Sequence, residues 1–252
     1  MGIEIIQLVA GIDLAIERNP LNPIHNKLNE LASHMKNIIH LIVDRKTKSC
    51  IVVDACWDID SILKFVDDHG YTIVSTIVTH YHFDHVGGSP PPPYDNLPIK
   101  ISGLATLLKK LPHIKAYIHP KDIPFIQQAN SSIPQNRLVP TCTDITEELN
   151  VGNIHIRFIH TPGHTPGSQS VLVNGARLLM GDVLLCGGLC GRTDLPGGDR
   201  RVMEHTLRHI LGPLDNRIVV YPGHDYGTTW STIGIERENG CLGDDLVGFG
   251  MA

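Results

Sequence analysis

Hydrophobic and polar residues follow one another in the first part of the chain as expected for an α/β protein. An apolar run from Asn37 to Val43, a polar turn over 44–48 and an apolar run from Cys50 to Asp54 predict two consecutive strands. Apolar residues at helical spacing predict a helix over Asp60 to Asp68, ended by Gly70. The order strand, strand, helix favours a mixed α/β architecture.

A β-branched run from Tyr71 to Thr79 predicts a buried strand, and a histidine cluster follows it at once. Residues 89–98 contain five prolines, which exclude a helix or a central strand, so we interpret this stretch as an inserted surface loop and place a proline-rich insertion at about 89–112. Asn174-Gly175 predicts a type I′ hairpin turn between two strands. We find no convincing element after Gly240. The remaining pattern predicts helices at about 103–111, 121–129 and 200–211, and strands at 153–159, 169–173, 176–180 and 217–221.

The 252 residues suit one domain, and we expect a single domain over 1–252. A net charge of −5 and only 5% aromatic residues argue against nucleic acid as a partner. No apolar run reaches membrane-spanning length and no secretory signal is evident, so we expect a cytoplasmic protein without membrane partners. The six cysteines are scattered through the chain and form no Cys-x-x-Cys motif, so we expect them to be mostly reduced thiols.

The strongest chemical signal is the string Thr79-His-Tyr-His-Phe-Asp-His85, which places three imidazoles and a carboxylate within six residues. Nitrogen and oxygen donors of this kind bind zinc or iron at about 2.0–2.2 Å. A tight loop at a strand end lets His80, His82, Asp84 and His85 converge. A solvated polar loop would rarely show the whole H-x-H-x-D-H pattern.

This string resembles the signature of the metallo-β-lactamase superfamily, and three later motifs agree with it over about Asn37 to Arg237. They are TPGHTPGS around His164, Gly-Asp at Asp182 and YPGHDY around His224. The resemblance implies a four-layer αβ/βα sandwich with two mixed sheets face to face and the metal loops at one edge. It also implies two zinc ions, with iron or manganese as substitutes, and seven ligands. By that resemblance, His80, His82 and His164 hold metal one, Asp84, His85 and His224 hold metal two, and Asp182 bridges both.

The stretch Gly191-Arg-Thr-Asp-Leu-Pro-Gly197 is similar to the glyoxalase II-like hydrolases and to the persulfide dioxygenases, which both act on glutathione-derived small molecules. We therefore expect a glyoxalase II-like hydrolase that cleaves a thioester with a metal-bridging hydroxide, Asp84 being catalytic. Arg192 either binds substrate or pairs with Asp194 to shape the loop, and the sequence favours neither role over the other.

Two alternatives remain. A persulfide dioxygenase would use one Fe(II) held by His80, His164 and Asp182. A non-catalytic binding protein on the same fold would be expected to lose ligands. Only 28 residues follow His224, so we expect no C-terminal helical domain of the glyoxalase II type. Among the other residues, His205 and His209 are interpreted as solvated helix positions, and Cys186 and Cys190 as small buried side chains rather than ligands.

Overall fold

The computed structural model describes residues 2–16, 22–92, 94–95, 99–141, 148–243 and 250–251. Parts of the proline-rich stretch, Cys142 and most of the glycine-rich tail therefore lie outside the described residues. The chain divides into two compact units. Unit 1 comprises 1–118, 123–140 and 151–154, and unit 2 comprises 119–122, 141–150 and 155–252.

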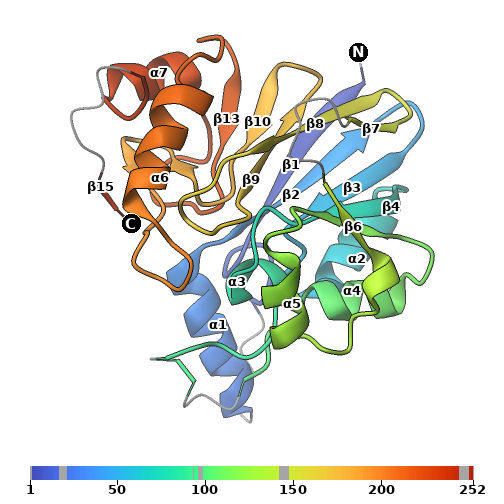
Figure 1. Cartoon of the computed structure of the whole chain (residues 1–252). Coiled ribbons are helices and arrows are strands. Elements are labelled where there is room, and N and C mark those ends of the chain that lie inside the picture. Colours follow the sequence, from blue (N-terminus) through green and yellow to red (C-terminus); the bar gives the residue numbers. More distant parts are fainter. Residues whose placement is uncertain are drawn as a thin grey trace. The chain divides into compact units, whose positions relative to one another are not determined.

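Unit 1 is built on a six-stranded mixed sheet with the order β1-β2-β3-β4-β5-β6 (Figure 1). The first three strands pair antiparallel, and β3 to β6 pair parallel. All seven residues of β2 are buried, so both faces of this strand are covered. The strands are β1 (Ile3–Val9), β2 (Ile38–Asp44), β3 (Ser49–Val53), β4 (Thr72–Ile77), β5 (Ala116–Ile118) and β6 (Leu138–Pro140).

Helices of unit 1 pack on this sheet through one hydrophobic cluster. Ile62 of α2 and Leu107 of α4 are fully buried in it, together with Leu41 and Val52 of the sheet. The Asp58 side chain caps α2 by accepting a hydrogen bond from the Ser61 amide at 3.0 Å. The helices are α1 (Pro23–Met35), α2 (Ile59–Asp68), α3 (Phe83–Val86), α4 (Leu104–Lys110) and α5 (Ile123–Ala129), and Gln135–Arg137 forms a 3₁₀ turn.

Unit 2 contains a second six-stranded mixed sheet, with the order β14-β13-β10-β9-β8-β7, and a small sheet with the order β11-β12-β15. In the larger sheet β8, β9 and β10 form an antiparallel meander, and β13 pairs parallel to β10. The strands are β7 (Glu148–Val151), β8 (Ile154–His160), β9 (Gln169–Val173), β10 (Arg177–Leu179), β11 (Leu184–Leu185), β12 (Leu189–Cys190), β13 (Val219–Tyr221), β14 (Ser231–Thr232) and β15 (Gly250–Met251).

Two helical segments cover the core of unit 2. The first begins as α6 (Arg200–His205) and continues as a π-helix over Thr206–Leu211. The second is α7 (Ile233–Glu238), capped by the Thr232 hydroxyl. Met203, Leu207 and Ile233 are fully buried in one cluster with Leu178 and Val220 of the sheet.

Most elements expected from the hydrophobic pattern are confirmed, including the helices at 104–110 and 123–129 and the hairpin turn. Asn174 and Gly175 both have positive φ, 49° and 66°, as a type I′ turn requires. The helix predicted over 200–211 is present, but its second half is π rather than α. The tail does contain an element, because β15 pairs with β12. Several elements were not predicted, among them β1, α1, the short strands β5 to β7 and α7.

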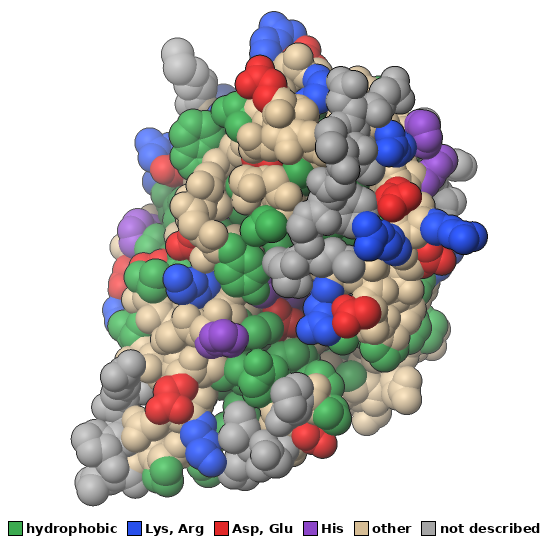
Figure 2. All heavy atoms as spheres, turned by 90° about the vertical axis from the view of Figure 1, so that its left-hand side faces the viewer, with side chains coloured by type: hydrophobic (Ala, Val, Ile, Leu, Met, Phe, Trp, Pro, Cys, Tyr) green, Lys and Arg blue, Asp and Glu red, His purple; other side chains and the backbone are tan. Residues whose placement is uncertain are grey.

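Among the described helices, none combines the length and the apolar character that a bilayer crossing requires. On the face shown in Figure 2, the Lys and Arg side chains lie among Asp and Glu side chains rather than gathering by sign. The described part of this face therefore presents mixed charges to an approaching ligand.

Candidate metal centre

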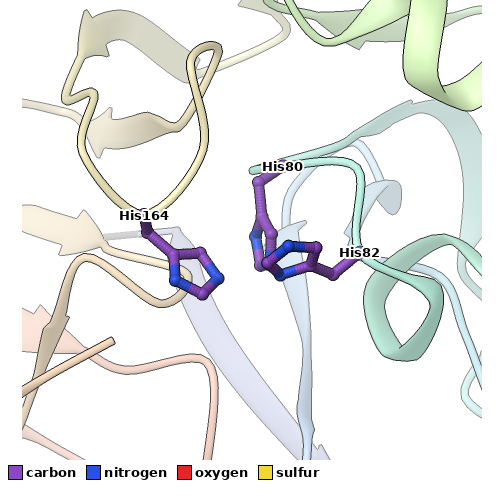
Figure 3. Close-up of side chains that lie close together, drawn as sticks. All are labelled: His80, His82 and His164. Carbon is purple, nitrogen blue, oxygen red and sulfur yellow. The ribbon is translucent and has the colours of Figure 1, made fainter. Parts of the chain in front are cut away.

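Four of the expected ligands lie on the segment that follows β4 in unit 1. His80 and His82 lie on the loop, and α3 then carries Asp84 and His85. The rings of His80 and His82 are nearly perpendicular, with centroids 4.8 Å apart (Figure 3). His80 also lies beside His85, with ring centroids at 4.1 Å. His80, Asp84 and His85 are buried, so the donors of this unit 1 cluster (His80, His82, Asp84 and His85) gather largely out of solvent.

Asp54, at the end of β3, orients two of these imidazoles, and the sequence patterns did not single it out. Its Oδ2 accepts hydrogen bonds from Nδ1 of His85 at 2.9 Å and from the Thr79 hydroxyl at 2.6 Å. Because the Thr79 hydroxyl hydrogen is directed to Asp54, its oxygen accepts from Nδ1 of His80 at 3.0 Å. Both rings therefore carry hydrogen on Nδ1, and their Nε2 atoms keep the lone pair that a metal needs.

A buried chain of hydrogen bonds fixes Asp84. The Trp57 indole N–H donates to Oδ1 of Asn37 at 2.9 Å, which sets the orientation of the Asn37 amide. Nδ2 of Asn37 then donates to Oδ2 of Asp84 at 2.9 Å and lies 3.1 Å from Nε2 of His85. Asn37 was expected only as the first residue of a strand, and the sequence patterns did not single out Trp57. Their role could be anticipated only by knowing that β2 and the β3–α2 connection end beside the histidine loop.

The other three expected ligands come together in unit 2, on three different loops. Oδ2 of Asp182 lies 3.7 Å from Nε2 of His164 and 3.1 Å from Nε2 of His224. His164 follows β8 (Figure 3), Asp182 follows β10 and His224 follows β13. One carboxylate oxygen thus faces two imidazole nitrogens. This arrangement would allow the carboxylate to bind a cation beside each imidazole, and these three residues form the unit 2 cluster.

Glycines and a backbone carbonyl allow this close approach. The carbonyl of Arg192 accepts a hydrogen bond from Nδ1 of His164 at 2.7 Å, which leaves Nε2 of His164 to face Asp182. A Cβ on Gly191 would lie 1.9 Å from the Asp182 carbonyl oxygen, and one on Gly223 would lie 2.4 Å from Oδ1 of Asp182. Only glycine fits at these two positions without displacing Asp182.

Arg192 forms an ion pair with Asp194, which is one of the two roles expected for it from the sequence. Its guanidinium donates to both carboxylate oxygens of Asp194 at 2.7 Å, and both side chains are more than half exposed. Arg192 lowers the pKa of Asp194 to about 2 through these hydrogen bonds. The substrate role of Arg192 stays a prediction.

The remaining candidate residues keep the structural character expected of them. His205 and His209 are exposed on their helix, with ring centroids 5.0 Å apart. Cys186 and Cys190 are buried free thiols, and burial raises the pKa of each to about 12.

The donor set fits divalent transition metals. In unit 1, the centroid of the His80 ring lies 4.8 Å from that of His82 and 4.1 Å from that of His85, and Nε2 of His85 lies 3.5 Å from Oδ2 of Asp84. In unit 2, Oδ2 of Asp182 lies within 3.7 Å of one imidazole nitrogen and 3.1 Å of another. Imidazole and carboxylate suit zinc, iron and manganese. Both clusters are therefore fit to take part in metal binding.

Comparison with known proteins gives consistent relatives. A zinc-dependent hydrolase of polyketide biosynthesis, BaeB from Bacillus velezensis, is 28% identical over 76% of this chain and 74% of its own length. The hydroxyacylglutathione hydrolase of Shewanella oneidensis is 29% identical over 73% of this chain and 61% of its length. The mitochondrial persulfide dioxygenase of Homo sapiens is 25% identical over 79% of this chain and 68% of its length.

Solved structures show the same fold. ETHE1 from Myxococcus xanthus matches with a TM-score of 0.65 and 25% identity, covering 82% of this chain and 79% of that one. The B3 metallo-β-lactamase BLEG-1 matches with a TM-score of 0.66 and 24% identity, covering 97% of this chain and all of that one. These matches confirm the expected fold class. The sequence profile of the metallo-beta-lactamase superfamily matches residues 39–224, and the chain therefore belongs to this superfamily.

Proposed function

We propose that the chain is a metal-dependent hydrolase of the glyoxalase II-like type, which cleaves a thioester of a glutathione conjugate. The observation that carries the proposal is the position of Asp182, whose Oδ2 faces both His164 and His224. In this proposal the unit 1 and unit 2 clusters supply one dinuclear centre, as the family resemblance implies. Zinc is the proposed metal, which agrees with the zinc-dependent hydrolase among the relatives.

Divalent cations held by these residues would lower the pKa of water to about 7 and polarise the thioester carbonyl. The protein contributes orientation. Asp84 accepts a hydrogen bond from Asn37 through Oδ2, so its carboxylate is held in one rotamer and can accept a proton from attacking water. A thiolate is a stable leaving group, so the reaction needs no strong general acid.

Arg192 is the proposed contact for a carboxylate of the glutathione moiety. Its pair with Asp194 is exposed on both sides, and such surface pairs contribute little to stability. A substrate carboxylate can therefore replace Asp194 on the same guanidinium at small cost. Arg192→Gln should then raise KM more than it lowers kcat.

The second candidate is a persulfide dioxygenase, supported by the human relative and by the Myxococcus structure. It would hold one Fe(II) with His80, His164 and Asp182, a set of two histidines and one carboxylate that leaves positions for oxygen. The third candidate, a binding protein without activity, is disfavoured because all seven ligand-type residues are present.

Metal analysis and two assays separate these functions. The protein is purified without chelators, its zinc, iron and manganese are quantified, and lactoylglutathione and other acyl thioesters are supplied. We expect about two zinc ions per chain and thioester cleavage that falls by orders of magnitude in Asp84→Asn. If Asp84→Asn retains wild-type turnover, the proposed mechanism is wrong. Oxygen uptake with glutathione persulfide and stoichiometric iron would establish the dioxygenase, and a chain that cannot be loaded with metal would be a binding protein.

A further inference from the structure

His164 lies on the loop Thr161–Ser168, which connects β8 to β9 and has its own network of hydrogen bonds. The Thr161 amide donates to the Ser168 carbonyl at 2.9 Å, closing the loop at its base. Thr165 and Ser168 bond through their hydroxyls at 2.9 Å. Outside the loop, the Thr206 hydroxyl donates to the Pro162 carbonyl at 2.6 Å. The residues just before His164 are therefore anchored to the π-helix.

Asp122 holds the residues just after His164. Its Oδ2 accepts a hydrogen bond from the Thr165 hydroxyl at 2.7 Å, and its Oδ1 accepts one from the Gly167 amide at 2.7 Å. Asp122 is fully buried, and Thr165 is fully buried as well. A Cβ on Gly167 would lie 2.4 Å from Oδ1 of Asp122, so the backbone approaches the carboxylate more closely than another residue would allow.

A histidine pair supports the same loop from the side. The rings of His119 and His160 stack with centroids 3.9 Å apart and only 5° between their planes. Nε2 of His160 donates to the Pro166 carbonyl at 2.9 Å. The amide of Asp122 donates to the His119 carbonyl at 3.0 Å, which links the stacked pair to the Asp122 turn. Segment 119–122 thus contacts the loop at Thr165 and Gly167 through Asp122, and His160, which stacks on His119, contacts the loop at Pro166.

We infer that Asp122 is a positioning residue for His164, an inference that rests on the proposed metal centre. The ring of His164 is fixed at Nδ1 by the Arg192 carbonyl, but its backbone position depends on the loop. Asp122 supplies two charge-assisted hydrogen bonds to residues one and three positions beyond His164. Without them the loop can shift, and Nε2 of His164 loses its alignment with Asp182.

The test compares Asp122→Ala with Thr165→Val, which removes the hydroxyl that donates to Asp122 and also bonds Ser168. Zinc affinity is measured by competition with a chromophoric chelator, and cobalt-substituted protein is followed by its visible absorption. We expect both variants to weaken zinc binding by about 10–100-fold and to alter the cobalt spectrum, as loss of an outer support of a ligand does. Asp122→Asn, which keeps an oxygen for Gly167, should fall between wild type and Asp122→Ala.

Matched controls separate positioning from general destabilisation. Asp44→Ala removes a carboxylate that accepts hydrogen bonds from Asn153 and Lys46 at the far end of β2, and Thr76→Val removes a buried hydroxyl that donates to Val52. Both should lower the unfolding temperature without changing zinc affinity.

His164→Ala serves as the reference for loss of the ligand itself. If it weakens zinc binding while Asp122→Ala and Thr165→Val bind like wild type, the inference is overturned. If His164→Ala itself binds zinc like wild type, the proposed metal centre fails. If Asp122→Ala does not fold, the zinc affinity of Thr165→Val alone tests the inference.

Discussion

Replacing Asp54 by Asn tests how strongly this carboxylate controls the metal-binding imidazoles. The substitution preserves shape but exchanges one carboxylate oxygen for a donating NH₂ group. In the wild type, the backbone amide of Thr79 donates to Oδ1 of Asp54 at 2.7 Å. If the side-chain oxygen of the introduced Asn keeps this bond, its NH₂ group faces two other donors, the Thr79 hydroxyl and Nδ1 of His85. His85 can resolve this conflict only by moving its hydrogen to Nε2, the nitrogen proposed to bind metal.

The magnitude follows from the bonds that are lost. A hydrogen bond to a charged group contributes about 1.5–3 kcal/mol, and 1.4 kcal/mol corresponds to a factor of ten in affinity. Loss of the His85–Asp54 bond alone should therefore weaken zinc binding by about 10–100-fold, the range found for outer partners of metal ligands. The second lost bond, from Thr79, should reduce the free energy of unfolding of metal-free protein as well.

Zinc affinity is measured by chelator competition, and unfolding is measured in urea without metal. Asp44→Asn is the control, because Asp44 also accepts several hydrogen bonds in unit 1 but lies at the opposite end of β2 from Asn37. Asp54→Asn should weaken zinc binding and Asp44→Asn should not. Equal zinc affinity in Asp54→Asn and wild type would refute the role assigned to Asp54.

Three further outcomes are expected. Burial raises the pKa of Cys50, Cys186 and Cys190 to about 12, so these thiols should resist iodoacetamide at about pH 8 until urea unfolds the chain. Mass spectrometry of the labelled peptides measures the extent of reaction. Rapid labelling of the folded protein would contradict this prediction. Burial, with repulsion from His160 and Lys121, lowers the pKa of His119 from 6.5 to about 3. The unfolded chain therefore binds a proton at this histidine that the folded metal-free protein does not bind. The free energy of unfolding should fall as the pH drops from about 6.5 toward 3, by at most about 1.4 kcal/mol per pH unit for this group. Urea titrations of His119→Gln should show a shallower pH dependence, and an unchanged slope would count against the assignment. Zinc at about 1,000 times its Kd should raise the free energy of unfolding by about 4 kcal/mol, a gain that chelation reverses; calorimetry with and without chelator measures it.

The strand and helix pattern and the ligand motifs were predictable because both depend on local sequence. Alternating or β-branched runs specify strands such as β4 and β8, and the H-x-H-x-D-H string is a dense group of donors within one loop. The family and its fold class followed from that string together with the His164, Asp182 and His224 motifs, and the comparisons confirm both.

The unpredicted features depend on long-range pairing. Strand β1 becomes a strand by pairing with β2, whose sequence lies beyond α1, and β15 is only two residues long. Asp54 and Asn37 contact the histidine loop only because β2, β3 and β4 are neighbours in the sheet. Helix α1 did carry local signals, since Asn22 caps it and Pro23 follows at the first position. Those signals could have predicted it.

The π-helical turn changes which residues of the helical segment Arg200–Leu211 share one face. The buried residues Met203, Leu207 and Leu211 are spaced by four, and an α-helix, which turns by about 100° per residue, would rotate Leu211 about 80° away from Met203. The wider π turn reduces that rotation, so all three side chains remain in the core. Removal of one exposed residue, such as His209, would restore the four-then-three spacing that a regular α-helix accommodates. The same helix could therefore lose one residue and keep its buried face, with Thr206 still bonded to Pro162 beside the His164 loop.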